Sequence, residues 1–395
     1  MEIKKINVIN PNEYGSLLYN EKENTALLNV MEERRIFRYS RTKYPYVKMF
    51  EEEISKKVNS KYCLGITSGT AGLITALKAI NIKPNDKVLV SSYTYIATAL
   101  AVKIVGGIPI PLNIDLKNGI DIEDLKEKID ISSCKAVIIT HLQGRCFNLK
   151  KVCDVIKKKN LYLIEDACQG FASNCNNIYA GTYGDIGVYS FQQFKQISAG
   201  EGGAIVTNNE ELYERARNYT DMGSIRNRFP SWNSDRCLIG QNYRMNNLTG
   251  GILYEQMKKL DNMIIKQKKS RKNILNIVKK HVVLEDNIIY SEDHEGDTGM
   301  NILVKVNANL NIHELIEDIK TKYNVEIRNM WNGLYFDNEL FKNQKLADIN
   351  FEGTNCDKTR DIVSKLFAVS IPPILTEENE ENIAKALIYF IRNNI

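Results

Sequence analysis

One lysine of the sequence stands between an apolar run and a glycine-rich turn. It is Lys195, in the stretch SFQQFKQISAGEGGAIVTNN (190–209). A lysine whose stem lies in an apolar pocket can act as a nucleophilic amine that forms a Schiff base with a carbonyl group. The glycines between 200 and 203 let the backbone pass close to a bulky group. Taken alone, this lysine is more simply explained as a solvated surface residue.

Two further stretches carry groups that could hold a ligand near such a lysine. In TSGTAGL (67–73) a Ser-Gly-Thr turn would begin a helix, where free N–H groups and the positive helix end attract anions. In IEDACQG (164–170) Asp166 and Gln169 follow an apolar run, and the carboxyl ends of parallel strands line the ligand crevice of such sheets. Each has a simpler explanation, as a helix cap or a surface polar group.

The order of these groups points to a cofactor. An anion turn, a carboxylate after a buried strand and, 29 residues beyond Asp166, the amine of Lys195 are what pyridoxal phosphate requires. The turn would bind the phosphate of the cofactor, the carboxylate would pair with its ring nitrogen, and the amine would react with its aldehyde. A nucleotide-binding dehydrogenase is a competing interpretation of the glycines. However, no GxGxxG follows the first predicted strand, and the glycines of GEGG precede a strand instead of a helix.

The elements that must position these groups alternate between strand and helix. Short runs rich in β-branched residues predict buried strands, and amphipathic stretches between several of them predict helices at 71–80, 96–105 and 149–160. The predicted strands are 87–92, 136–142, 161–167, 186–191 and 203–208. This alternation predicts an α/β fold with a mostly parallel sheet and helices on both of its faces.

The pattern changes after about residue 245. Residues 246–280 predict one or two long helices, and the remainder predicts a smaller α+β domain. We therefore expect a large domain with an N-terminal arm over residues 1–255 and a small C-terminal domain over 256–395. A chain of 395 residues with 43% hydrophobic content suits two domains.

Composition argues against several classes of protein. The net charge of +5 arises from 53 basic and 48 acidic residues spread along the chain, so no nucleic-acid partner is predicted. No apolar run approaches the roughly 20 residues that span a bilayer, and the N-terminus lacks a signal-peptide core, so a cytoplasmic location is expected. Eight cysteines without a CxxC pair, with only four histidines, predict reduced thiols and no metal site.

Several motifs in order resemble one enzyme family. They are SGTAGL, SSYTYIAT, IEDACQG, GTYGDIGVYSF, KQISAGEGG and GQNYRM. The sequence is similar to the DegT/DnrJ/EryC1/StrS family of pyridoxal-phosphate-dependent sugar aminotransferases, over most of the chain. The resemblance implies fold type I, the aspartate-aminotransferase-like fold of these transferases.

The resemblance also implies a role for each site residue. Lys195 would hold the cofactor and shuttle a proton during catalysis, while Asp166 would pair with the ring nitrogen. The other implied contacts are Gln169 with the ring hydroxyl, Tyr95 with the ring face, and Gly69, Thr70 and Ser190 with the phosphate. Asn242 of GQNYRM would reach the phosphate from the neighbouring subunit. The implied assembly is a homodimer with shared active sites.

The function implied is transfer of an amino group from glutamate or glutamine to a keto sugar, either a nucleotide-linked sugar or a sugar acid. FRYS (37–40), SFQQFKQISAGEGG (190–203) and HEGDTG (294–299) resemble a subgroup that includes an aminotransferase for an oxidised 3-deoxy-octulosonate. Some relatives replace the lysine with histidine and catalyse dehydration, and the presence of Lys195 argues for transamination. A sugar dehydratase and a non-catalytic sensor or scaffold are the alternatives.

The sequence leaves the substrate side of the site open. No motif pairs arginines for a second, distal carboxylate, so any one of four single arginines could hold the donor's carboxylate or an acidic sugar. They are Arg38, Arg145, Arg244 and Arg328. His141, Arg145, Trp331 and Tyr335 are further candidates for substrate contact, and each also has an ordinary packing explanation.

Overall fold

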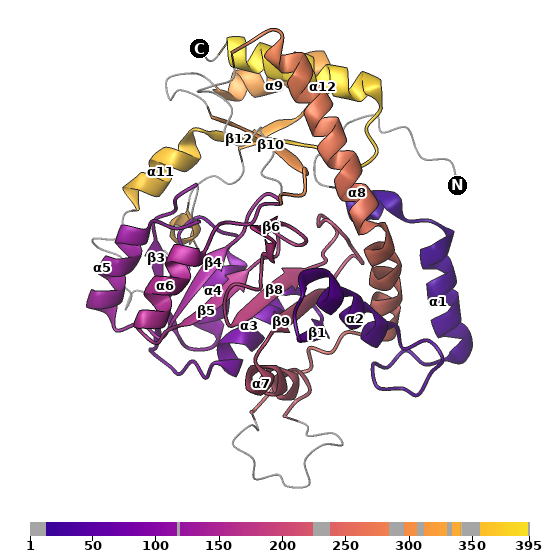
Figure 1. The fold of residues 1–395 in the computed structure, drawn as a ribbon, viewed down its shortest axis with the longest axis vertical. Helices are drawn as coiled ribbons and strands as arrows, with labels where there is room; N and C mark the ends of the chain where they lie inside the picture. The colour runs from indigo at the N-terminus through magenta and orange to yellow at the C-terminus, as the bar shows by residue number, and fades with distance from the viewer. Residues whose placement is uncertain are drawn as a thin grey trace.

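A seven-stranded sheet forms the centre of the large domain (Figure 1). The computed structural model describes residues 13–116, 119–223, 238–283, 296–305, 312–329, 334–339, 341 and 356–393. The sheet has the order β1-β9-β8-β5-β4-β2-β3, and only β9 runs antiparallel to its neighbours. Its strands are β1 (Tyr62–Ile66), β2 (Lys87–Ser91), β3 (Ile108–Leu112), β4 (Ala136–Thr140), β5 (Tyr162–Asp166), β8 (Ile186–Ser190) and β9 (Gly203–Thr207). The predicted mostly parallel α/β fold is confirmed.

Helices cover both faces of this sheet because its strands present apolar side chains alternately to each side. Val88 and Val90 of β2 pack toward α3, α4 and α7, whereas Leu89 packs toward α5 and α6. These helices are α3 (Gly69–Ala79), α4 (Ala97–Ile104), α5 (Ile122–Ser132), α6 (Lys150–Lys158) and α7 (Glu210–Thr220). The groups at the strand ends are thereby fixed on a rigid, buried frame.

Several elements of the large domain were not among the sequence predictions, β3 and α5 among them. β3 carries prolines at 109 and 111, which remove strand hydrogen-bond donors, and it tolerates them because it is an edge strand paired only with β2. α5 begins at an Asp121 cap whose carboxylate accepts the backbone N–H groups of Glu123 and Asp124. β6 (Asn174–Cys175) and β7 (Ile178–Tyr179) form a further small hairpin.

The N-terminal arm packs on the large domain. It contains η1 (Gly15–Leu18), α1 (Glu21–Glu33) and α2 (Tyr46–Val58). Both α1 and α2 lie against α8 (Asn247–Lys279) in Figure 1, and a side chain at Gly250 of α8 would lie 2.6 Å from the backbone nitrogen of Val47. Close contact between α2 and α8 therefore requires glycine at this position.

The small domain is a three-stranded antiparallel sheet covered by helices (Figure 1). It contains β10 (Asn301–Lys305), α9 (Ile312–Tyr323), β11 (Ile327–Asn329), α11 (Asp357–Ser364), β12 (Leu366–Ser370) and α12 (Glu377–Arg392), and the short η2 (Tyr335–Asp337) precedes α11. The end of α8 shares its core. Since α8 is one continuous helix of 33 residues, it passes through the predicted domain boundary at 255, which stays a prediction.

Among the described residues, no helix is long and apolar enough to cross a bilayer. Seven of the eight cysteines are described, and all seven are free thiols. The eighth, Cys237, lies outside the described residues.

Candidate active site

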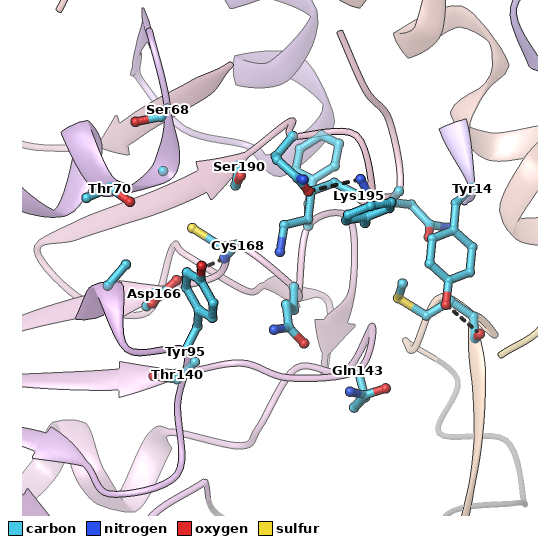
Figure 2. Close-up of a pocket in the computed structure, with 18 of the residues that line it drawn as sticks. Tyr14, Ser68, Thr70, Tyr95, Thr140, Gln143, Asp166, Cys168, Ser190 and Lys195 are labelled. Atoms are coloured by element: carbon cyan, nitrogen blue, oxygen red, sulfur yellow. Dashed lines mark hydrogen bonds between the residues drawn. The ribbon is translucent and has the colours of Figure 1, made fainter. Parts of the chain in front are cut away.

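One cavity of about 600 Å³ brings together seven of the eight predicted cofactor-binding residues (Figure 2). They are Gly69, Thr70, Tyr95, Asp166, Gln169, Ser190 and Lys195. The cavity lies where β4, β5 and β8 end, at the carboxyl edge of the parallel strands. Asn242 is exposed, pairs through a bridge with Asp221, and is not among the residues that line this cavity. That Asn242 contacts the phosphate in the partner subunit's site stays a prediction.

Lys195 is presented by a loop between two antiparallel strands, β8 and β9. Phe191 donates its backbone N–H to Gly202 at 2.8 Å, and Gln193 donates to Gly200 at 3.0 Å, so the two sides of the loop are held together. Gly200 has a φ of 78°, a conformation that favours glycine. The sequence placed this lysine next to the glycines, and the loop's closure explains why they are needed.

The carboxylate of Asp166 is buried and doubly hydrogen-bonded. The hydroxyl of Thr98 donates to Oδ2 at 2.6 Å and the backbone N–H of Cys168 donates to Oδ1 at 3.2 Å. Behind Thr98, the hydroxyls of Thr94 and Thr140 continue the chain at 2.7 and 2.9 Å. These donors fix the position of the Asp166 carboxylate at the end of β5. The sequence analysis missed Thr98, although its spacing of four from Thr94 at a helix start was a usable signal.

The turn at the start of α3 forms the other end of the cavity. Ser68 caps the helix, its hydroxyl accepting the N–H of Ala71 at 3.1 Å, and the first turn directs free N–H groups outward. A side chain at Gly69 would lie 2.7 Å from Sγ of Cys168 and 2.9 Å from Cβ of Ser190. Close approach of the strand ends therefore requires glycine here. Burial raises the pKa of the Cys168 thiol, which keeps this neighbour uncharged.

The donor set fits pyridoxal phosphate. The α3 turn and Ser190 offer neutral donors for a dianionic phosphate, a buried carboxylate suits a protonated ring nitrogen, and Lys195 supplies the amine. A cavity of about 600 Å³ lies within the usual range of roughly 300–1,000 Å³ for cofactor sites. Residues Gly69, Ser190, Asp166 and Lys195 could thus hold the cofactor with its charged groups satisfied.

The rest of the cavity wall comes from distant segments that sequence reasoning had not joined. Tyr14 of the arm is buried, and its hydroxyl lies 3.4 Å from Oδ1 of Asn301 on β10. Arg328 of β11 donates to the hydroxyl of Ser370 at 3.0 Å and also lines the cavity. Burial raises the pKa of Tyr14, while the nearby charge of Arg328 opposes this shift. No motif around Tyr14 signals this placement.

The remaining candidates for substrate contact fall into different places. His141 is buried, accepts the N–H of Phe147 at Nδ1 and donates from Nε2 to Glu165 at 2.8 Å, so it braces the sheet edge. Tyr335 is also buried, and neither it nor His141 is among the residues that line the main cavity. Arg145 lines a separate cavity of about 30 Å³. Trp331 and the first two residues of HEGDTG lie outside the described residues.

Comparison with known proteins identifies a matching family and several relatives. The model of the DegT/DnrJ/EryC1/StrS aminotransferase family matches residues 20–388. A GDP-perosamine synthase of Escherichia coli O157:H7 is 32% identical over 246 residues, which are 61% of this chain and 66% of that protein. A GDP-4-keto-6-deoxy-D-mannose 3-dehydratase of Escherichia coli O55:H7 is 27% identical over 82% of this chain and 86% of its own length.

A solved structure with the same fold is that of NtdA from Bacillus subtilis with bound cofactor PMP. It matches with a TM-score of 0.82 at 23% identity, over 94% of this chain and 82% of that one. At this identity the likeness establishes the fold, which agrees with the expected fold type I. The region matched to the GDP-perosamine synthases of Escherichia coli and Vibrio cholerae spans 66% and 62% of their length.

Proposed function

Because the chain belongs to the DegT/DnrJ/EryC1/StrS aminotransferase family, we propose that it transfers an amino group from glutamate or glutamine to a keto sugar. Pyridoxal 5′-phosphate is the cofactor of this family. The observation that carries the proposal is the joint placement of Lys195, Asp166 and the α3 turn in one cavity. A scaffold or sensor would need none of these groups.

Each residue of the cavity has a distinct task in this proposal. When bound, the cofactor supplies an aldehyde that takes up the amino group and a ring that withdraws electrons from the reacting carbon. The α3 turn and Ser190 would bind its phosphate, and Tyr95 would lie against its ring. The carboxylate of Asp166, positioned by hydrogen bonds from Thr98 and Cys168, would pair with the protonated ring nitrogen.

Lys195 would act twice. Its Nζ would attach the cofactor, and after substrate displaces it, the same amine would move a proton between the substrate carbon and the cofactor carbon. The loop from β8 to β9 limits where this amine can reach, because its backbone bonds fix both ends of the loop. Gln169 would bind the ring hydroxyl and thereby orient the ring toward Lys195.

Arg328 would bind the carboxylate of the amino donor. Of the four arginines considered from the sequence, it lines the cavity that contains Lys195. Arg38 pairs with Glu51 at 2.5 Å, and Arg244 pairs with Asp221. A guanidinium group provides the two parallel N–H donors that fit a carboxylate. An arginine in this position would explain why glutamate can bind as the amino donor.

The active site would be shared across a homodimer. Seven of the predicted cofactor residues line one cavity, whereas Asn242 of the same motif set lies outside it on an exposed segment before α8. A second copy could bring its own Asn242 to the phosphate. Such a shared site would require a two-fold arrangement in which each subunit completes the other.

The test uses the purified protein loaded with pyridoxal phosphate. Glutamate and glutamine are tried as donors, and two sugars are tried as acceptors: GDP-4-keto-6-deoxymannose and an oxidised 3-deoxy-octulosonate. Mass spectrometry should find an amino sugar from one of them, and absorbance should report the cofactor's change in each half-reaction. Pyruvate and oxaloacetate are the comparison acceptors. Efficient use of these acids, with no response to either sugar, would identify a general amino-acid aminotransferase instead.

The dehydratase alternative is decided by the same experiment. One similar protein is a 3-dehydratase, but Lys195 offers an amine that can re-form its bond with the cofactor at the end of each amino-transfer cycle, which favours transamination. A dehydratase would use the electrons and the amino group of glutamate. The hydroxyl group of GDP-4-keto-6-deoxymannose would leave as water, and the donor's nitrogen would be released as ammonia beside a deoxygenated keto sugar and 2-oxoglutarate. Finding that keto sugar instead of an amino sugar would establish the alternative.

A further inference from the structure

A strained glutamine faces the cavity from the turn after β4. Gln143 has a φ of 59° and Gly144 a φ of 72°, and the N–H of Arg145 donates to the carbonyl of Leu142 at 3.1 Å. Two consecutive positive φ values with this bond are the mark of a type I′ turn. The first central position of that turn favours Asn, Asp or Gly, so a glutamine there calls for an explanation.

The amide of Gln143 is also left unsatisfied. Its Oε1 is buried, and no group in the described part of the chain bonds to it. Buried polar atoms without a partner are uncommon in folded proteins and destabilise them. Backbone strain and an unpaired polar atom thus coincide at one residue, a combination that clusters at ligand-binding sites.

The surrounding backbone holds this turn firmly in place. The N–H of Gly144 donates to the carbonyl of Gln169 at 2.8 Å, and the carbonyl of Gly144 accepts the N–H of Thr298 at 2.9 Å. A side chain at Gly144 would lie 2.1 Å from the hydroxyl of Thr298. The turn is therefore tied to a cofactor-site residue on one side and to the segment leading into β10 on the other.

Gln143 reaches the same cavity as Lys195. In the view of Figure 2 its side chain lies at the opposite end from Ser68 and Thr70, on the side of Tyr14. If the phosphate occupies the α3 turn, the reacting substrate must extend from Lys195 toward this side. A strained side chain held there is placed to contact substrate.

We propose that Gln143 is a specificity-determining residue whose amide oxygen accepts a hydrogen bond from a hydroxyl group of the keto sugar. This inference rests on the proposed function, and it adds the substrate contact that the cofactor motifs leave out. The hydroxyl of Tyr14 already has Asn301 as a neighbour, whereas the oxygen of Gln143 has no partner in the described residues. A polyhydroxylated substrate supplies the hydrogen-bond donor that glutamate, whose amino group would react with the cofactor, does not.

The experiment compares Gln143→Met with Gln143→Gly in the full-length holoenzyme. Methionine keeps the length and the backbone strain but removes the amide, while glycine removes both the amide and the strain. The two half-reactions are followed separately by cofactor absorbance, with glutamate as donor and with whichever of the two probe sugars the wild type accepts. Thermal unfolding of each variant is measured in parallel.

Both variants should raise the KM for the sugar by about 10- to 100-fold, the effect expected of one lost buried hydrogen bond. The glutamate half-reaction should stay within about 3-fold of wild type, because the donor does not use this contact. Gln143→Gly should unfold at the same or a higher temperature. A purely structural glutamine would instead change both half-reactions and lower the unfolding temperature of Gln143→Met.

Failure of this inference can be told from failure of the proposed function. If the wild type accepts a probe sugar and both variants keep its KM, the contact proposal is wrong and water satisfies the amide. If both half-reactions fall together, Gln143 acts on the cofactor or the fold, which also overturns it. If the wild type accepts neither probe sugar, the proposed function and this inference fall together.

Discussion

The two ends of the cavity are built in different ways. At the cofactor end, Asp166 and Ser190 terminate neighbouring strands of one sheet, and the α3 turn follows a third. At the substrate end, Tyr14 comes from the arm, and Arg328 comes from the small domain. The first end is one rigid edge with satisfied hydrogen bonds, whereas the second is assembled from separate layers.

This difference assigns separate kinetic roles to the two ends. Groups at the cofactor end act in both half-reactions, because donor and acceptor use the same cofactor. A group at the substrate end contacts only one of the two substrates and should change one half-reaction alone. Substitutions at the two ends can therefore test whether the division is real.

The largest effect is expected at Lys195. Lys195→Ala should lower the rates of both half-reactions by about 10⁴-fold or more, because it removes a proton-transfer group and the covalent attachment. Borohydride reduction of the wild type followed by peptide mapping should place the pyridoxyl label on Lys195. Lys48→Ala, on the exposed face of α2, is the control. A label on another lysine would refute the assignment.

Asp166→Asn should lower both half-reactions by about 10²- to 10⁴-fold while preserving the fold. An amide cannot keep a proton on the ring nitrogen as a carboxylate does. Rates of each half-reaction and the circular dichroism spectrum are the measurements. Turnover near that of the wild type would mean that Asp166 does not pair with the ring nitrogen of the cofactor.

Asn242 tests whether the cofactor end extends into a second subunit. Asn242→Leu and Lys195→Ala chains should each be inactive alone. Mixing equal amounts should restore up to about a quarter of wild-type activity, because about half of the dimers become heterodimers and one of the two sites in each heterodimer is intact. Activity is assayed after subunit exchange, alongside light scattering. A fully active monomer would end the shared-site proposal.

Arg328→Gln should raise the KM for glutamate by about 10- to 100-fold and leave the sugar half-reaction nearly unchanged. The variant loses the charge-assisted hydrogen bonds between the guanidinium group and the donor carboxylate, while the residues at the cofactor end are unchanged. Steady-state kinetics with each substrate varied in turn provide the check. If the sugar KM rises and that of glutamate does not, Arg328 binds an acidic sugar instead.

The smallest effect is expected for Thr98→Val, about 10-fold in both half-reactions. The variant removes the 2.6 Å bond to Asp166 but keeps the shape of the side chain. Without this bond the carboxylate should be less firmly positioned toward the cofactor ring, and the rates of both half-reactions are the measurement. Thr98→Ser, which retains the hydroxyl, should restore these rates. Rates of Thr98→Val equal to those of the wild type would show that this bond does not position Asp166.

The sequence by itself determined the cofactor end. Buried strands show up as β-branched runs, and the predicted strand at 161–167 corresponds to β5 (Tyr162–Asp166). Because parallel strands of one sheet end at one edge, residues just beyond each run had to converge. Direction along a strand and order along the chain predicted that Asp166 and Lys195 meet, and the family resemblance added Ser190 to this group.

Only the tertiary structure decided the substrate end. Tyr14 and Asn301 are 287 positions apart, and nothing in the spacing along either segment says that arm and small domain meet at this cavity. His141 directly follows β4 and Asp166 ends the neighbouring β5, yet the side chain of His141 is buried against Glu165 and does not line the cavity. Local pattern fixes the direction of a side chain within an element, but which elements lie together depends on how the layers bury their apolar faces.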